Sequence, residues 1–142
     1  MHQYEIDYAG WASEQADLLR SGQVTLLDTQ HLVEELESIM ANERREIYRR
    51  LRVLIAYLLK WQFQPDHRSN SWRATIRVQR DDIEDVLQHS PSLAKEIEGK
   101  ILQAYPKARE LVADETGLIE QDLPRVCPYS EKEILDPDFW PD

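Results

Sequence analysis

The chain has 142 residues, 42% of them hydrophobic, and a net charge of −10. This length and apolar content suit a single domain with a hydrophobic core, and they exclude a wholly disordered chain. The negative net charge excludes a general nucleic-acid coating protein, because such proteins neutralise phosphates with a basic surface. We therefore expect one domain over residues 1–142.

Positive charge is concentrated in one part of the chain. Residues 44–80 contain ten Lys and Arg against two acidic residues, a balance of +8, so the rest of the chain sums to −18. This local excess has two interpretations: a binding site for a small anion or phosphate, or a solvated surface that pairs with the chain's own acids. The asymmetry also predicts a homo-oligomer or a protein partner.

Cysteine usage and apolar runs predict the compartment. Cys127 is the single cysteine, so the chain can form neither an internal disulfide nor a cysteine-based zinc site. Residues 1–5 lack the basic start of a secretory signal, and the longest apolar run, residues 53–59, is short of the roughly 20 residues that a membrane-spanning helix needs. We expect a cytoplasmic protein with no membrane contact.

Few glycines and recurrent apolar spacings of three and four predict an all-α fold. The first helix should run from about Asp7 to Arg20, with Trp11 on its apolar side. It should end near Gly22, because glycine readily adopts the left-handed conformation that closes helices. A short loop then leads to Asp28, which suits the N-cap of the next helix.

The second helix should continue from Asp28 to Trp61 and stop before Pro65. One apolar face joins Leu32, Leu36, Met40, Ile47, Leu51, Leu54 and Leu58, and Arg44 shares it. Arg45, Arg49, Arg52 and Lys60 fall on the opposite face. The pattern leaves two alternatives, one long helix or a break near Ala41 and Asn42.

Two more helices and an arm complete the predicted fold. Caps within residues 69–71 open a third helix, and Ser90 followed by Pro91 opens a fourth that closes at Gly117. Residues 121–142 are rich in proline and should be mostly extended, with one short helix opened by the capping box Ser130 to Glu133.

The fold class follows from these elements. It is an all-α, single-domain helical bundle over residues 1–120 with a long second helix. We expect an αα-hairpin around residues 28–88. A mostly extended C-terminal arm should cover residues 121–142.

The corner between the second and third helices is the candidate functional site. Arginines there suit an anion, tryptophans suit stacking, and amides with a hydroxyl suit orientation of a ligand. The candidate ligand-binding residues are Trp61, Gln62, Gln64, Arg68, Trp72, Arg73, Thr75, Gln79 and Arg80. The alternative is an internal polar network that fixes the corner, in which tryptophan N–H groups and glutamines bond the loop backbone. If the basic face is solvated instead, we expect Arg80 to pair with Glu84 at helical spacing.

Two classes of function remain open. The preferred one is a binding or interaction module that uses residues 61–80. The alternative is an enzyme on a phosphorylated or nucleic-acid substrate, with Glu34, Glu35 or Asp66 as general base or metal ligand. Phosphate-binding glycine loops and repeated metal-ligand spacings are absent from the sequence, so no cofactor and no metal site are predicted.

The pattern of tryptophan, glutamine and arginine in residues 60–80 resembles the hallmark of the bacterial domain-of-unknown-function 29 family. In this chain it reads Lys60-Trp61-Gln62-x-Gln64-Pro65-x-x-Arg68-x-x-Ser71-Trp72-x-x-Thr75-Ile76-x-x-Gln79-Arg80. Further similarity lies in residues 7–19, Glu34-Glu35, Ser90-Pro91 and Cys127-Pro128. The resemblance covers nearly the whole chain and implies an all-helical domain, but it implies no reaction.

Overall fold

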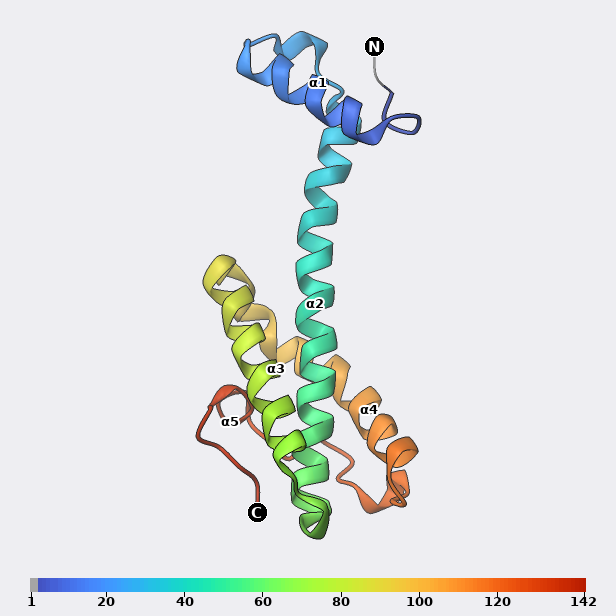
Figure 1. The fold of residues 1–142 in the computed structure, drawn as a ribbon, viewed down its shortest axis with the longest axis vertical. Helices are drawn as coiled ribbons and strands as arrows, with labels where there is room; N and C mark the ends of the chain where they lie inside the picture. The colour runs from blue at the N-terminus through green and yellow to red at the C-terminus, as the bar shows by residue number, and fades with distance from the viewer. Residues whose placement is uncertain (1–2) are drawn as a thin grey trace. The chain divides into compact units, whose positions relative to one another are not determined.

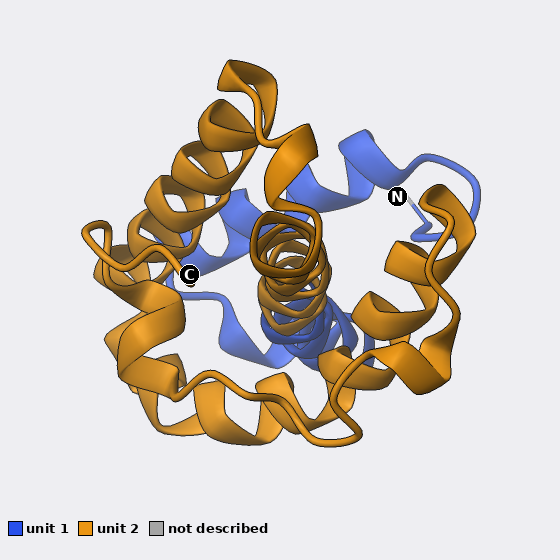
Figure 2. Cartoon of the chain, turned by 90° about the horizontal axis from the view of Figure 1, so that it is seen from below, with its two compact units in different colours: residues 1–42 blue, residues 43–142 orange. Residues whose placement is uncertain are grey.

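The computed structural model describes residues 3–142 (Figure 1). Met1 and His2, the start of the segment considered as a secretory signal, lie outside the described residues. The part described contains helices and no strand, which confirms the all-α prediction. It divides into two compact units, unit 1 over residues 1–42 and unit 2 over residues 43–142 (Figure 2). The single domain stays a prediction.

Unit 1 contains helix α1, Tyr8–Arg20, and a single turn η1, Val24–Leu26. The Asp7 carboxylate caps α1 by accepting a hydrogen bond from the Gly10 amide at 3.0 Å. Gly22 has a φ of 73°, so the left-handed residue predicted after this helix is confirmed.

Helix α2, Thr29–Phe63, is the long second helix of the prediction. Its helical assignment continues through Ala41 and Asn42, so the alternative with a break there is wrong. The helix ends two residues before Pro65, which opens the turn η2, Pro65–His67. Proline lacks an amide hydrogen and disfavours helical geometry in the preceding residue, which explains this end point.

Unit 2 places the C-terminal half of α2 at its centre, where Figure 2 shows the other elements of the unit around it. They are α3, Asn70–His89; η3, Pro91–Glu96; α4, Ile97–Glu115; η4, Glu120–Asp122; and α5, Glu131–Leu135. Arg50 contacts Asp82 at 2.8 Å, and Tyr57 lies edge-on to Trp72 with ring centroids 6.4 Å apart. These two contacts confirm the antiparallel hairpin of α2 and α3.

The core of unit 2 is built on the apolar face of α2. Its fully buried side chains include Ile47, Leu51, Leu54, Ile55, Leu58, Leu59, Ile76, Ile83, Ile97, Val112 and Ile134. The predicted apolar series is therefore correct from Ile47 onward. It is wrong for Leu36 and Met40, whose side chains are 62% and 48% exposed.

Several helix ends differ from the prediction. Ser90 does not cap a helix; its hydroxyl donates to the Glu43 carboxylate, and residues 91–96 form a turn before α4. Gly117 has no left-handed backbone, since Thr116 closes α4 by donating to the Val112 carbonyl at 2.7 Å. The capping box is confirmed, because Ser130 accepts from the Glu133 amide at 3.1 Å.

Two basic residues of α2 differ in burial from the prediction. Arg44 is not in the core: its guanidinium binds the Glu96 carboxylate at 2.8 Å, and its side chain is 41% exposed. Lys60 is buried rather than solvated. Its ammonium lies 3.4 Å from Glu115 and 4.3 Å from the centre of the Tyr57 ring. The α4 helix supplies the carboxylate that makes this burial possible.

Candidate functional site

The predicted corner does not form one cluster. Three of its side chains, those of Trp61, Arg73 and Arg80, contact the Trp140 ring of the C-terminal arm. Arg68 lies over Trp61 and donates to the Pro141 carbonyl at 3.4 Å. We call these four residues together with Trp140 the clasp. Of the other five predicted residues, Gln62 contacts the arm and the rest make contacts elsewhere.

Stacked rings and guanidinium groups build the clasp. Trp61 is 7% exposed, and its ring centre lies 4.8 Å from that of Trp140. The Arg73 guanidinium lies over both rings, at 5.5 and 5.9 Å from their centres. Arg68 covers Trp61 at 5.0 Å and donates to its backbone carbonyl at 2.7 Å. The guanidinium groups that were predicted to bind an anion therefore make cation–π contacts with tryptophan rings.

Arg80 is the buried member of the clasp, 4% exposed. Its Nε donates to the Ile134 carbonyl at 2.8 Å and its Nη2 to the Glu133 carbonyl at 3.3 Å, so the predicted pair with Glu84 is wrong. The Nη1 has no protein partner. Arg80 and Trp140 border a hollow of about 30 Å³, enough for roughly one water molecule.

A second contact ties the arm to the corner. The Tyr129 hydroxyl donates to the Gln62 amide oxygen at 2.7 Å, and Tyr129 is itself 7% exposed. Burial raises the pKa of this tyrosine. Gln62 and the clasp thus bind residues 129–141 of the same chain in the way that a protein binds a peptide. The arm contributes backbone carbonyls, the Tyr129 hydroxyl and the Trp140 ring.

The remaining predicted residues serve other contacts. Trp72 packs edge-on against Tyr57, Thr75 donates to the Ser71 carbonyl in its own helix at 3.0 Å, and Gln79 accepts from Arg50 at 3.4 Å. The backbone of Gln64 closes α2 by donating to the Lys60 carbonyl at 2.9 Å.

Sequence reasoning missed Trp140 and Tyr129 as partners of the corner. The signal for Trp140 was an aromatic pair, Phe139 and Trp140, at the end of an acidic arm. Helical periodicity gives no information about which surface such an arm covers. As a site for a separate ligand, the nine-residue corner stays a prediction.

Unit 1 holds a second cluster, made of rings and carboxylates. Tyr4 stacks on His31 with ring centres 4.2 Å apart, and Trp11 lies edge-on to Tyr4 at 4.8 Å. Asp28 accepts from the Trp11 ring nitrogen at 2.9 Å and lies 2.7 Å from His31 Nδ1. The hydrogen bond to Asp28 raises the pKa of His31, and the same contact lowers the pKa of Asp28.

The carboxylates proposed for catalysis show different environments. Glu35 accepts hydrogen bonds from the hydroxyls of Tyr4 and Tyr8, the latter at 2.5 Å, and these bonds lower its pKa. A carboxylate held ionised in this way is an acceptor rather than a group poised to exchange protons near neutral pH. Glu34 and Asp66 are exposed. Within residues 3–142, no three His, Cys, Asp or Glu side chains group as metal ligands.

The surface of unit 1 is unusually apolar. Within its described residues, Trp11 is the one buried large hydrophobic side chain. The exposed large hydrophobic side chains of the same unit are Ile6, Tyr8, Leu19, Val24, Leu26, Val33, Leu36, Ile39 and Met40. Among them, Leu36, Ile39 and Met40 are neighbours by helical spacing on α2, and exposed apolar side chains that gather in this way mark interaction sites in soluble proteins.

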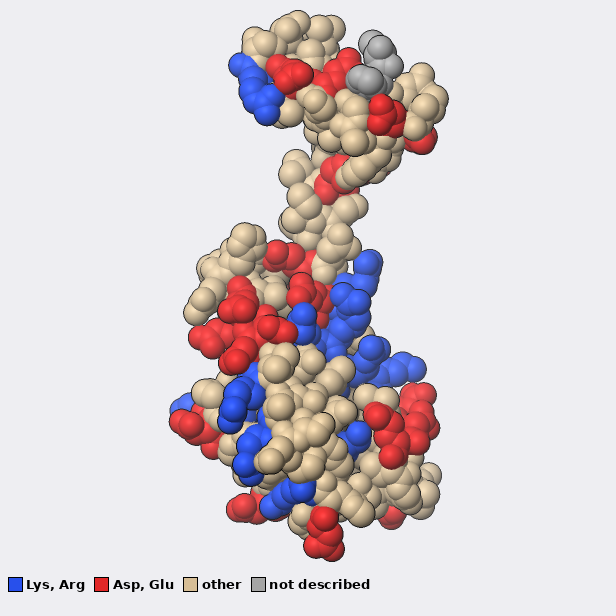
Figure 3. Space-filling view, viewed as in Figure 1, with Lys and Arg blue, Asp and Glu red and all other residues tan. Residues whose placement is uncertain are grey.

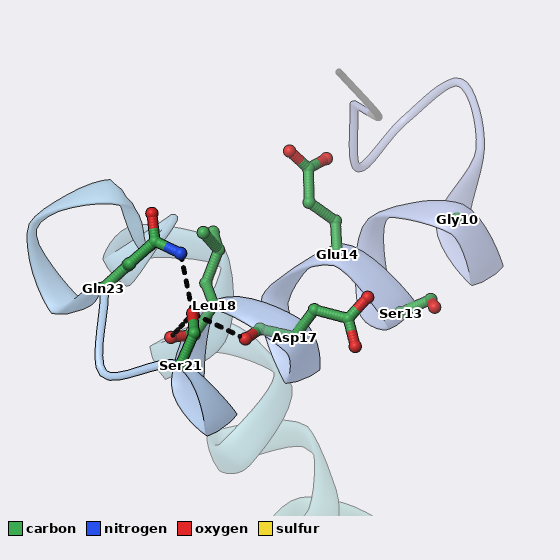
Figure 4. A pocket seen from close by; sticks show the side chains of 7 residues that line it. All are labelled: Gly10, Ser13, Glu14, Asp17, Leu18, Ser21 and Gln23. Carbon is green, nitrogen blue, oxygen red and sulfur yellow. Dashed lines mark hydrogen bonds between the residues drawn. The ribbon is translucent and has the colours of Figure 1, made fainter.

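An open groove of about 660 Å³ runs along α1 in the same unit (Figure 4). Glu14 and Asp17 project from the helix at this groove, and Leu18, Ser21 and Gln23 border its other end. Asp17 pairs with Arg20 at 2.7 Å, but both side chains are more than 70% exposed, so solvent screens this pair. The groove is therefore acidic with an apolar edge.

The fold and these contacts define an all-helical domain. None of the helices within residues 3–142 combines the length and apolarity needed to cross a membrane. Residues 3–140 match the family model described as Domain of unknown function DUF29, so the chain belongs to the DUF29 family. No curated protein and no solved structure matches the chain.

Proposed function

We propose that this chain is a protein-interaction module that binds a cationic amphipathic helix of a partner protein through unit 1. The observation that carries the proposal is the set of large apolar side chains that unit 1 leaves in water. Transferring such side chains from water into a contact contributes about 25 cal/mol for each Å² of apolar surface. A partner that covers them would stabilise the unit as it binds.

The arrangement of the apolar side chains suits a helical partner. Leu32, Leu36 and Ile39 follow one another on α2 at intervals of four and three, with Val33 and Met40 beside them. This is the spacing by which one helix packs its apolar side chains against another. Leu36 and Ile39 are 62% and 58% exposed, so both are open to a partner.

The charge of unit 1 specifies the partner further. Residues 3–42 contain eight Asp and Glu against Arg20 alone among Lys and Arg. Contact between two copies of this unit would bring like charges together, whereas a cationic segment meets complementary charge. Glu14 and Asp17 at the α1 groove are two of these carboxylates. We therefore assign the surface to a cationic partner rather than to a second copy.

The corner supports a binding role of a different kind. Its side chains contact residues 129–141 of the same chain. The guanidinium groups donate to backbone carbonyls, and the Trp61 ring packs against Trp140. We propose that its ligand is this arm. The partner of the whole module then binds unit 1 and leaves the clasp closed.

A pair of designed peptides tests the proposal. One is an amphipathic helix of leucine and lysine, and the other has glutamate in place of each lysine. We expect the chain to bind the lysine peptide in fluorescence anisotropy. The double substitution Leu36→Asn with Ile39→Asn should weaken binding about tenfold or more, the loss typical of central interface residues. Leu102→Asn is the control, because Leu102 is an equally exposed leucine, at 68%, in unit 2.

Three results would overturn the proposal. The first is equal binding of the two peptides, and the second is an equal loss in the control variant. The third comes from the mass of the free chain in solution, measured by light scattering. A dimer that the double substitution dissociates would assign this surface to a second copy of the chain.

A further inference from the structure

A groove on unit 2 is lined by residues outside the clasp. It has a volume of about 330 Å³ and is lined by Glu46, Arg49, Arg50, Arg52 and Val53 of α2 and by Gln79 of α3. Figure 3 shows Lys and Arg side chains gathered beside the middle of α2. All three of these arginines line the same groove.

Arg50 binds the two acidic side chains near the groove. Its Nε lies 3.0 Å from Glu46 and its Nη1 lies 2.8 Å from Asp82. The same Nη1 donates to the Gln79 amide oxygen at 3.4 Å. Because the oxygen of Gln79 is engaged, its NH₂ group is left as the donor on that side chain. One guanidinium offsets one of the two carboxylates, so the groove with Arg49 and Arg52 carries a net charge of +1. The bond from Arg50 also orients Gln79.

Arg49 and Arg52 provide the positive charge that remains. Arg49 is exposed, and no hydrogen bond or ion pair engages it within residues 3–142. The Arg52 guanidinium lies over the Tyr48 ring, 5.6 Å from its centre. A contact of this kind uses the face of the guanidinium and leaves its N–H groups at the edge free to donate. Two cations and one amide donor therefore line the same groove.

These donors fit a phosphate group better than a carboxylate. Guanidinium groups bind phosphate oxygens through paired hydrogen bonds, and the three terminal oxygens of a phosphate monoester give each of the three donor side chains an acceptor. A phosphodiester has two such oxygens and leaves one of the three donor side chains without its own acceptor. We infer that the groove between α2 and α3 binds the phosphate of a small phosphate monoester, held by Arg49, Arg52 and Gln79.

A neighbouring hollow gives space for the organic part of the ligand. It has a volume of about 210 Å³, and Arg52 and Val53 line it as they line the first groove. Leu111 of α4 adds apolar surface on its other side, and Lys107 there is engaged with Glu110 at 3.5 Å. The carbon skeleton of the monoester lies along Val53 and Leu111. A monoester should therefore bind more tightly than inorganic phosphate.

Isothermal titration calorimetry of the full chain tests the inference. The probes are inorganic phosphate, glycerol 3-phosphate and glycerol, all at one ionic strength. We expect glycerol 3-phosphate to bind most tightly and glycerol not to bind. Arg49→Gln should weaken binding of the monoester about tenfold or more, the loss expected for a hydrogen bond between charged groups. The exposed Arg49 makes no contact whose loss would unfold the chain.

Arg125→Gln is the matched control, because it removes the same charge from an exposed arginine elsewhere in unit 2. It should leave the affinity unchanged within about twofold. Absence of binding by both phosphates, or an equal loss in this control, would overturn the inference. So would tighter, Arg49-dependent binding of a single-stranded oligonucleotide or of anionic phospholipid vesicles, since the phosphate source would then be a macromolecule or a membrane.

Discussion

Two leucines on α2 allow a direct test of where the core ends. Leu36 and Leu54 belong to one predicted apolar series, yet Leu36 is 62% exposed and Leu54 is fully buried. Leu54→Ala should cost about 3 to 5 kcal/mol, because it removes three buried carbons and leaves a cavity in packed surroundings. For Leu36→Ala we expect at most about 1 kcal/mol, since full burial of a leucine contributes about 1.5 to 3 kcal/mol and most of this side chain is in water.

Urea unfolding followed by far-ultraviolet circular dichroism measures both variants. Two protein concentrations separate folding from association, because a contact between copies would stabilise the more concentrated sample. Hydrogen exchange of residues 29–42 adds a local measurement for unit 1. A cost for Leu36→Ala equal to that for Leu54→Ala, independent of concentration, would refute the reasoning. It would mean that another part of the chain covers Leu36.

Two further predictions concern the clasp and the cluster of unit 1. Trp140→Ala should lower the free energy of unfolding of unit 2 by about 2 kcal/mol, because it removes a half-buried ring that contacts Trp61; a change in urea unfolding below about 0.5 kcal/mol would contradict this. The pKa of His31 lies above its ordinary 6.5 because Asp28 accepts its hydrogen bond. The contribution of the His31–Asp28 contact to folding stability is therefore complete below pH 6.5. It is lost as the pH rises through the higher pKa that His31 has in the folded chain. Nuclear magnetic resonance titration of the His31 ring should show a midpoint above 6.5. If Asp28→Asn does not change this midpoint, the contact with Asp28 is not the cause of the raised pKa.

Local rules account for the helix ends that the sequence predicts correctly. Asp7, Gly22 and Ser130 act on backbone groups within a few residues, so neighbouring sequence is enough to assign them. Ser90 shows the limit of such rules. Its hydroxyl finds the Glu43 carboxylate, which is distant in sequence, and the expected cap is lost.

Helical periodicity places a side chain on a face of a helix but leaves open what covers that face. Lys60 is buried because Glu115 of α4 lies beside it, and Arg44 is half-exposed because Glu96 binds it at the surface. Leu36 is exposed because no part of the described chain covers it. Each of these outcomes depends on a distant segment. A single sequence contains no direct signal for that segment.

The candidate site shows the same limit. Its unusual residues could be singled out from their types, and Trp61, Arg68, Arg73 and Arg80 do lie together. Three of them pack against Trp140, and this partner could not be assigned, because pairing across such a distance in sequence is not encoded in local spacing. The grouping of donors at the α2 groove was likewise hidden, since it requires Gln79 of α3 beside the arginines of α2.

The clasp also determines where the chain loses entropy on folding. Helical proteins fold quickly in general because their contacts are local in sequence. Here Tyr129 bonds to Gln62 across 67 residues, and Arg80 bonds to Ile134 across 54. The cost of closing a loop grows with the logarithm of its length, so these contacts become affordable only after the hairpin of α2 and α3 has shortened the effective loop. We therefore expect the arm to dock after the hairpin has formed.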